Sequence, residues 1–119
     1  IEMTKRGSGK IVYLAPGGWD KHADPLRYET VKAGTIALTQ ALARRLASSR
    51  INVNCIVPGY IGGVKGSNTA IGKTSKVIDH IPIGYLGEVQ DIAETVYFLI
   101  SDSSKYLTGQ MLLVAGGLD

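Results

Sequence analysis

The sequence predicts an α/β protein in which helices flank a parallel sheet. Three short apolar runs, at residues 10–14, 51–57 and 111–114, have the length and continuity of strands that are buried on both faces. Two segments with helical periodicity separate these runs, and proline or glycine follows each run within two residues. Strands that alternate with helices in this order form crossover units, which are right-handed almost without exception.

The composition limits the classes of function. A chain of 119 residues with 45% apolar and 19% charged residues forms at most one domain with a modest core. The net charge of +3 comes from scattered lysines and arginines rather than from a basic stripe, so we expect no nucleic-acid partner. No apolar run approaches the ~20 residues of a membrane span, and no signal stretch opens the chain. We therefore expect no membrane partner and a cytoplasmic location.

Neither the cysteine nor the histidines indicate a reactive or metal-binding centre. Cys55 is the single cysteine and lies inside an apolar run, so we interpret it as a small buried residue rather than a nucleophile. His22 and His80 have no cysteine or histidine at the spacing of metal ligands. The sequence therefore predicts no metal site.

The first third of the chain predicts a short helix, a strand and a long helix. Residues 1–6 have the composition of a helix end, with Gly7 as a stop. Because so short a helix is not stable alone, we expect that a segment before Ile1 is missing. After the strand at 10–14, a helix is expected from about Leu26 to about Ser48, just after Pro25. Its apolar stripe consists of Val31, Leu38, Leu42 and Leu46.

The sequence from residue 51 onward predicts a strand, a lid, a helix and a further strand. The strand at 51–57 ends at Pro58-Gly59, and the glycine-rich segment 60–87 follows, with a turn or two of helix around 74–80. Loops of this length in compact domains are usually functional lids or mobile. Residues 88–91 begin the next helix, with the acidic Glu88 and Asp91 in its first turn. The apolar residues of this helix recur at helical spacing as far as Ile100. The last strand is expected at 111–114.

Tyr28 and Lys32 form the candidate catalytic pair. They lie four residues apart, so one helical turn places both on the same face. A nearby ammonium favours the phenolate and lowers the pKa of a phenol from about 10 toward working pH. Such a pair can exchange a proton with a substrate oxygen. The same spacing also occurs in ordinary amphipathic pairs on helix surfaces, so alone it has a high false-positive risk.

Several linked segments of the chain resemble the short-chain dehydrogenases/reductases. They occur in the family's order and spacing: Gly9-Lys10-Ile11-Val12, Tyr28-x-x-x-Lys32-Ala33-Gly34, residues 51–59, and Tyr106-Leu107-Thr108-Gly109-Gln110. The resemblance covers essentially the whole chain but only the second half of the family's domain. It implies the second half of a doubly wound Rossmann-type parallel sheet, three strands with flanking helices. Residues 1–119 would be this C-terminal half, and the nucleotide-binding first half would be absent.

The resemblance also implies roles for particular residues. The cofactor would be NADP or NAD, and the substrate a small-molecule carbonyl or alcohol. Tyr28 would exchange a proton with the substrate oxygen, while Lys32 would lower the pKa of Tyr28 and bind the nicotinamide ribose. Pro58, Gly59 and the backbone near Ile61 would flank the nicotinamide, and residues 60–87 would close over the substrate. The long helix would pair with its copy in a homo-oligomer, a dimer or a tetramer.

The sequence departs from the family's pattern at several positions. Pro16 occupies the position of the catalytic serine, and proline has neither a hydroxyl nor an N–H to polarise a substrate oxygen. Losing one such donor commonly lowers the rate by about 10²–10³. Asp20 is an alternative donor if its loop folds back. Gly63 replaces a threonine that meets the nicotinamide amide, and Ala115 replaces the aspartate of the usual Val-Asp-Gly-Gly.

Two functions therefore remain open. The first is an NAD(P)-dependent oxidoreductase of which these residues are the catalytic half, inactive when alone. The second is a non-catalytic module, truncated or degenerate, with a structural or oligomerisation role. The sequence favours the first for the parent protein. The resemblance implies that the three strands lie side by side at one end of the family's sheet, so the strand at 10–14 would be an open edge. We expect a neighbouring chain, a second copy or a missing segment to pair with it.

Overall fold

The computed structural model describes residues 2–15, 25–63 and 74–118. In chain order its elements are α1 (Glu2–Arg6), β1 (Gly9–Leu14), α2 (Pro25–Leu46), β2 (Ile51–Pro58), α3 (Thr74–Ile78), α4 (Val89–Ile100) and β3 (Met111–Val114). Short 3₁₀ turns follow α2 at Ala47–Ser49 and α4 at Asp102–Ser104. The predicted strands and helices are thus confirmed, with bounds that move by only one or two residues.

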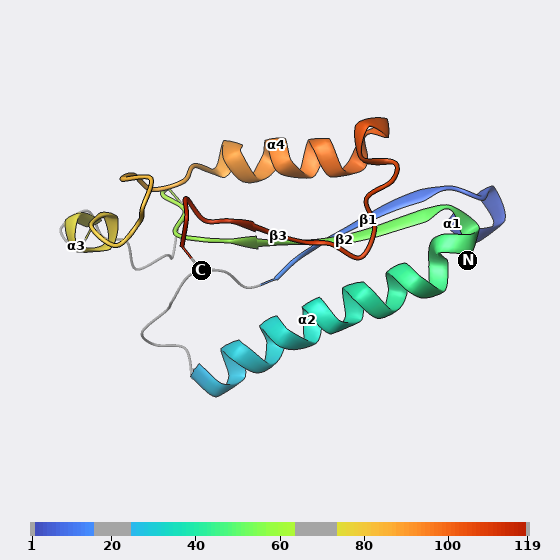
Figure 1. The fold of residues 1–119 in the computed structure, drawn as a ribbon, viewed down its shortest axis with the longest axis horizontal. Coiled ribbons are helices and arrows are strands. Elements are labelled where there is room, and N and C mark those ends of the chain that lie inside the picture. The colour runs from blue at the N-terminus through green and yellow to red at the C-terminus, as the bar shows by residue number, and fades with distance from the viewer. Residues whose placement is uncertain (1, 16–24, 64–73, 119) are drawn as a thin grey trace.

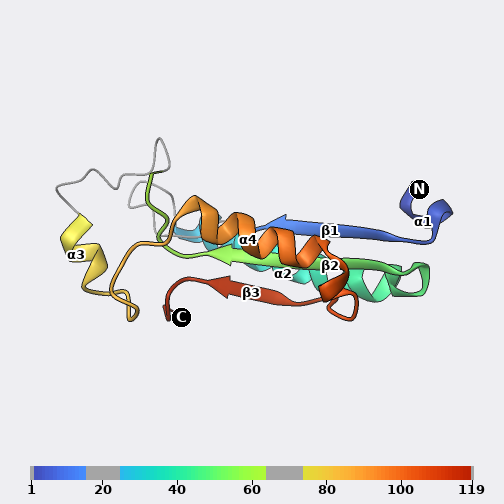
Figure 2. The same ribbon diagram turned by 90° about the horizontal axis from the view of Figure 1, so that it is seen from above.

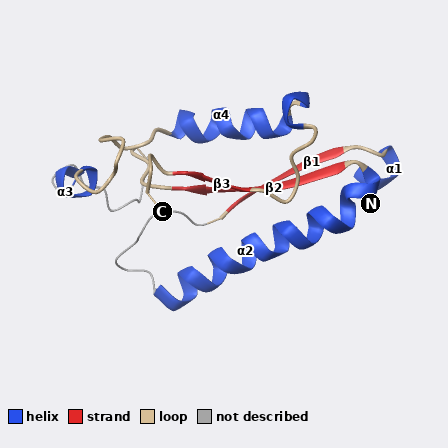
Figure 3. Ribbon diagram, in the orientation of Figure 1, coloured by secondary structure: helices blue, strands red, loops and turns tan. Residues whose placement is uncertain are grey.

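The sheet is parallel and lies between two helices. Its strand order is β1-β2-β3, and β2 pairs in parallel with both neighbours. Figure 1 shows α2 on one face of the sheet and α4 on the other. The view from above in Figure 2 shows β1 and β3 on either side of β2 beneath α4, and Figure 3 marks helices and strands by colour. The α/β fold class predicted from the sequence is confirmed.

The core is built around β2, the central strand. Val53, Cys55, Ile56 and Val57 on this strand are buried. Val53 packs with Ala43 of α2, and on the other side of the molecule Leu99 of α4 is fully buried. Burial of both faces explains why the strand reads as a continuous apolar run. Cys55 is a buried free thiol, as its place in the apolar run indicated.

Two asparagines of β2 hold the segment that leads into β3. The buried side chain of Asn54 donates to the Leu107 carbonyl at 3.0 Å and accepts from the Gln110 N–H at 3.0 Å. Asn52 donates to the carbonyls of Lys105 and Leu107 at 3.1 and 3.0 Å. Buried polar groups in folded proteins are almost always paired in this way. These bonds set the position from which β3 enters the sheet.

The short α1 helix ends at a glycine, as predicted. Gly7 adopts a left-handed φ of 69°, and its N–H donates to the Met3 carbonyl at 2.9 Å. A residue without Cβ takes this conformation at little cost, so Gly7 turns the chain into β1. Among the described residues β1 pairs only with β2, so its outer edge has no strand partner in residues 2–15, 25–63 and 74–118. The expected partner for that edge stays a prediction.

Candidate active site

The candidate site lies at the end of the sheet where the strands finish. In a parallel strand–helix–strand unit, the amino end of the helix lies near the carboxyl ends of the strands, as Figure 1 shows for α2, β1 and β2. Open α/β sheets bind ligands at this edge. Tyr28 and Lys32 lie near the start of α2, while Pro58 ends β2 and Gly59 and Ile61 follow it. All of the described candidate residues are therefore at one end of the fold.

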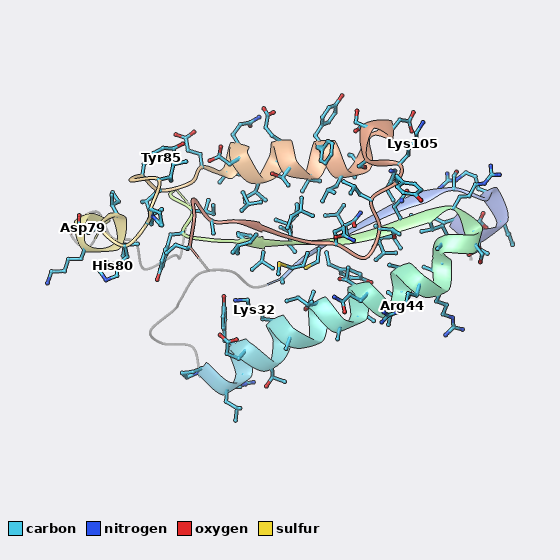
Figure 4. The ribbon with its side chains drawn as sticks, viewed as in Figure 1. Lys32, Arg44, Asp79, His80, Tyr85 and Lys105 are labelled. Carbon is cyan, nitrogen blue, oxygen red and sulfur yellow. The ribbon has the colours of Figure 1, made fainter. Side chains whose placement is uncertain are left out.

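Tyr28 and Lys32 share the inward face of α2. Both side chains are half-buried, whereas residues 29–31 and 33–34 are exposed. The same face continues into the buried Thr39 and Ala43, which pack against the sheet. Figure 4 shows the Lys32 side chain on the side of α2 that faces the sheet. The shared face predicted from the four-residue spacing is therefore present.

The electrostatics of Tyr28 differ from the prediction. Burial raises the pKa of the phenol above its ordinary value of 10.0, and Glu29 and Tyr60 raise it further. Lys32 is not among the causes, so the expected lowering of this pKa by the ammonium is wrong for the described chain. Helical spacing fixes which face two residues share but not how closely their terminal groups approach. Tyr28 is therefore protonated at neutral pH.

The ammonium group of Lys32 has no ion-pair or hydrogen-bond partner among the described residues. The salt bridge found there joins Lys5 to Glu2, and no hydrogen bond or ion pair links Lys32 to another described residue. Its side chain is nevertheless half-buried on the inward face. An ammonium group in such a place offers three hydrogen-bond donors to a ligand.

The chain just after β2 is held in place by backbone contacts. The Gly59 N–H donates to the Val114 carbonyl at 2.9 Å, and a Cβ at Gly59 would lie 2.6 Å from the Cβ of Ala115. Contacts that short do not occur between real side chains, so only glycine fits at this position. The close approach fixes the direction in which residues 60–62 leave the sheet.

The backbone N–H and C=O of Ile61 point away from the segment that contains Gly87. It forms an isolated parallel bridge with Gly87, in which Gly87 N–H donates to the Tyr60 carbonyl at 3.0 Å and Gly62 N–H donates to the Gly87 carbonyl at 2.8 Å. The bridge therefore uses the groups of residues 60 and 62, and the N–H and C=O of Ile61 point to the opposite side. Within the described part of the chain neither group has a hydrogen-bond partner.

A pocket of about 470 Å³ adjoins this segment. It lies between the start of α4, the end of β3 and the segment before α4, and its lining includes Tyr60, Ile61, Ile83, Tyr85, Asp91 and Glu94. Of the predicted site residues only Ile61 lines it, whereas Tyr28, Lys32, Pro58 and Gly59 do not. Asp91 also accepts a hydrogen bond from the Glu88 N–H at 2.7 Å and so caps α4.

Tyr60 is the site residue that sequence reasoning missed. It lines the pocket, and it lies near enough to Tyr28 to affect the pKa of that phenol. The available signal was its position directly after Pro58-Gly59, which places it at the carboxyl end of a strand. Pro16, Asp20 and residues 64–73 of the predicted lid lie outside the described residues.

The described residues contain neither a metal-binding cluster nor a helix that could span a membrane. No group of three or more histidine, cysteine, aspartate or glutamate residues is placed to hold a metal ion in residues 2–15, 25–63 and 74–118. Among the helices described, none combines the length and apolar character needed to cross a membrane. Neither finding adds a residue to the site.

Known proteins match the chain over nearly its whole length. The family model described as Enoyl-(Acyl carrier protein) reductase matches residues 1–119. The chain is 38% identical over 118 residues to the 3-oxoacyl-(acyl-carrier-protein) reductase FabG of Staphylococcus epidermidis. It is 37% identical over 118 residues to the acetoacetyl-CoA reductase of Rhizobium meliloti. A third relative, the (hydroxy(phenyl)methyl)succinyl-CoA dehydrogenase subunit BbsD of Thauera aromatica, is 37% identical over 115 residues.

These alignments cover 97–98% of this chain but only 46–48% of each relative. The chain therefore spans about half the length of the curated relatives it matches. The matched half includes the parallel sheet and the helix that carries Tyr28 and Lys32. From the match of the family model to all 119 residues, together with these relatives, we conclude that the chain belongs to the short-chain dehydrogenase/reductase family.

Proposed function

We propose that the full-length protein is an NAD(P)-dependent oxidoreductase that interconverts a carbonyl and an alcohol. One observation carries the proposal: Tyr28 and Lys32 are half-buried on one face of α2, at the edge where the strands end, while their helix neighbours are exposed. A phenol and an ammonium held together at this edge suit proton transfer beside a bound nucleotide. Residues 1–119 alone are expected to have no turnover.

The described residues fit the nicotinamide end of the cofactor. The Lys32 ammonium, without a protein partner in the described ranges, suits the ribose hydroxyls. The outward N–H and C=O of Ile61 suit the carboxamide, and Pro58 and Gly59 form the adjoining wall. When bound, the cofactor supplies hydride to the substrate carbon or accepts it from that carbon. Either NADP or NAD is consistent with these contacts, because all of them lie at the nicotinamide end.

Tyr28 acts as the proton donor in the direction of reduction. Its raised pKa keeps the phenol protonated at neutral pH. As the substrate carbon gains hydride, negative charge develops on the oxygen, and Tyr28 transfers its proton there. The tyrosinate that results takes a proton from solvent. In the reverse direction the tyrosinate removes the hydroxyl proton of the alcohol.

The names of the relatives suggest a substrate class. FabG and the acetoacetyl-CoA reductase are named for 3-oxoacyl groups carried on acyl carrier protein or on CoA. We infer that the substrate is a small carbonyl compound of this kind, and that acetoacetyl-CoA is the first to assay with NADPH and NADH. Carbonyl-dependent oxidation of either reduced nucleotide by the full-length protein, abolished by Tyr28→Phe, is the expected result.

The same proposal includes a homo-oligomer. One side of α2 exposes Val31 and Leu38, whose exposed fractions are 56% and 47%. Exposed apolar side chains along a long helix are typical of an interaction surface. We propose that two copies of α2 pair through this face, in a dimer or a tetramer located in the cytoplasm.

A non-catalytic module is the second candidate, and Pro16 favours it. A proline at the position of the catalytic serine lacks the hydroxyl that polarises the substrate oxygen. Calorimetric titration of the full-length protein with NADH and NADPH separates the two candidates. An oxidoreductase binds at least one of the nucleotides, whereas a degenerate module that binds neither would refute the first candidate.

A further inference from the structure

Tyr60 occupies the same edge of the sheet as Tyr28. It follows β2 by two residues, and Tyr28 lies in the first turn of α2, whose amino end adjoins the carboxyl ends of the strands (Figure 1). Both side chains are half-buried. The parallel topology therefore brings the two phenols to the same edge of the sheet from distant parts of the sequence.

The backbone of Tyr60 is fixed on both sides. Before it, Gly59 lies against Ala115 too closely for any Cβ and is held to the Val114 carbonyl. At Tyr60 itself, the carbonyl accepts a hydrogen bond from Gly87 N–H at 3.0 Å. A main chain anchored in this way limits where the ring can lie, which suits a group that must meet a substrate atom.

The Tyr60 hydroxyl is available to a ligand. Among the described residues, the hydrogen bonds of Tyr60 involve its main chain and none involves its hydroxyl. The residue also lines the pocket of about 470 Å³ beside α4. Its influence on the pKa of Tyr28 supports the closeness of the two phenols. Tyr60 thus lines the pocket and lies within electrostatic reach of Tyr28, which itself does not line the pocket.

The chemistry calls for a second donor. A carbonyl oxygen has two lone pairs, so it can accept from two hydroxyl groups as negative charge develops on it. Tyr28 supplies one of these bonds together with the transferred proton. Position 16 holds a proline, which has no hydroxyl and no N–H to supply the other.

We propose that the Tyr60 hydroxyl is the second hydrogen-bond donor to the substrate oxygen, beside Tyr28. The inference rests on the proposed oxidoreductase function. Tyr60 stabilises the charge that develops on the oxygen and keeps its own proton, since the proton that moves is the one from Tyr28. Tyr60 is in this sense a catalytic residue that takes over the polarising role for which position 16 has no suitable group.

The test is the variant Tyr60→Phe in the full-length protein, which lacks only the hydroxyl oxygen of Tyr60. Tyr60→Phe keeps the ring, so packing and cofactor binding should be preserved while kcat for acetoacetyl-CoA reduction falls about 10²–10³-fold, the loss typical of one such donor. Tyr97→Phe is the matched control, because Tyr97 is 73% exposed on α4 and does not line the pocket, and its kcat should be little changed. Melting temperature and the Kd of NADPH and NADH are measured for every variant.

Replacement of Tyr60 by para-aminophenylalanine separates hydrogen bonding from packing. This side chain restores an N–H donor at the position of the hydroxyl, so it should recover part of the rate lost in Tyr60→Phe. If the wild-type protein and Tyr60→Phe turn over equally while Tyr28→Phe is inactive, the role of Tyr60 is refuted and the oxidoreductase function stands. If the amino variant is as slow as a stably folded Tyr60→Phe, the donor role is also refuted. If the wild-type protein neither binds nor oxidises either nucleotide, the proposed function itself fails.

Discussion

Tyr28 and Tyr60 lie at the same edge of the sheet although 31 intervening residues separate them in the sequence, and Tyr60 contributes, after burial and Glu29, to the raised pKa of Tyr28. The contribution adds to those of burial and of Glu29, so the chain stabilises the protonated form of Tyr28. For a reductase this is the useful form, because the proton must be present when charge develops on the substrate oxygen. The same arrangement disfavours alcohol oxidation at neutral pH, since that direction needs the tyrosinate.

The pH dependence follows from the sign of this shift. An acid with a raised pKa keeps its proton below that value and loses it as the pH rises through it. Carbonyl reduction should therefore persist across neutral pH and decline only in the alkaline range above the ordinary tyrosine value of 10.0, while alcohol oxidation should rise with pH. Initial rates in both directions, measured against pH under saturating cofactor, check this. A reduction rate that already declines between neutral pH and the ordinary tyrosine value would contradict it.

Lys32→Met should weaken cofactor binding. The substitution removes a half-buried ammonium that has no ion-pair partner in the described ranges. It should therefore lower the affinity for the cofactor and leave the stability of the fold unchanged. A hydrogen bond to a charged group contributes about 1.5–3 kcal/mol, which corresponds to a rise in Kd of about 10- to 100-fold. Titration of NADH and NADPH measures the change.

The matched control for that variant is Lys105→Met, which changes the net charge equally. Lys105 is exposed just after the turn that follows α4, far from Lys32 in Figure 4. Its substitution should leave both Kd values unchanged. Equal losses in the two variants would show that overall charge, rather than a contact at Lys32, governs binding.

Asn54→Ala should destabilise the fold. The substitution removes two hydrogen bonds of the buried Asn54 amide, one to the Leu107 carbonyl and one from the Gln110 N–H, and only the Leu107 carbonyl keeps another donor, Asn52. An unpaired polar group costs about 1–3 kcal/mol where it is buried. We expect the free energy of unfolding of the full-length protein to fall by about 2–4 kcal/mol in chemical denaturation. Gln90→Ala is the control, because it removes an exposed side-chain hydrogen bond to Glu94 and should change stability little. Equal stability of the two variants would be inconsistent with a structural role for Asn54.

Leu38→Glu should reduce the oligomer. It places a charge in the middle of the exposed apolar face of α2, where a paired helix would have to bury it. Light scattering after size exclusion should give a smaller mass for this variant than for Ser48→Glu, which adds the same charge at an exposed position just beyond α2. An unchanged mass for Leu38→Glu would exclude pairing through this face.

Much of the fold was predictable from local patterns. The apolar runs predicted all three strands, although of these only β2 is buried on both faces, and Met111 and Leu113 of β3 are exposed. The helical period predicted α2 and α4, although Val31 and Leu38 of the predicted α2 stripe are exposed. The shared face of Tyr28 and Lys32 followed from spacing alone. These features depend on residues close together in the sequence, so a single sequence contains the information.

The electrostatics and the pocket were not predictable in the same way. The pKa of Tyr28 depends on how deeply α2 sits against the sheet and on Tyr60, which arrives from the end of another strand. The pocket forms where α4, the end of β3 and residues 81–87 come together. The periodicity of apolar residues does not predict which of these segments are in contact. Such properties arise only when distant segments are brought together.

The central claim is that Tyr28 transfers a proton to a substrate oxygen beside a nicotinamide, and Tyr28→Phe tests it most directly. In the full-length protein the variant loses one oxygen atom, so it should bind NADPH or NADH as the wild type does. Its rate of acetoacetyl-CoA-dependent cofactor oxidation should fall by about 10²–10⁴-fold, the range for loss of a positioned acid. A Tyr28→Phe protein that oxidises the cofactor as fast as the wild type would contradict the assignment.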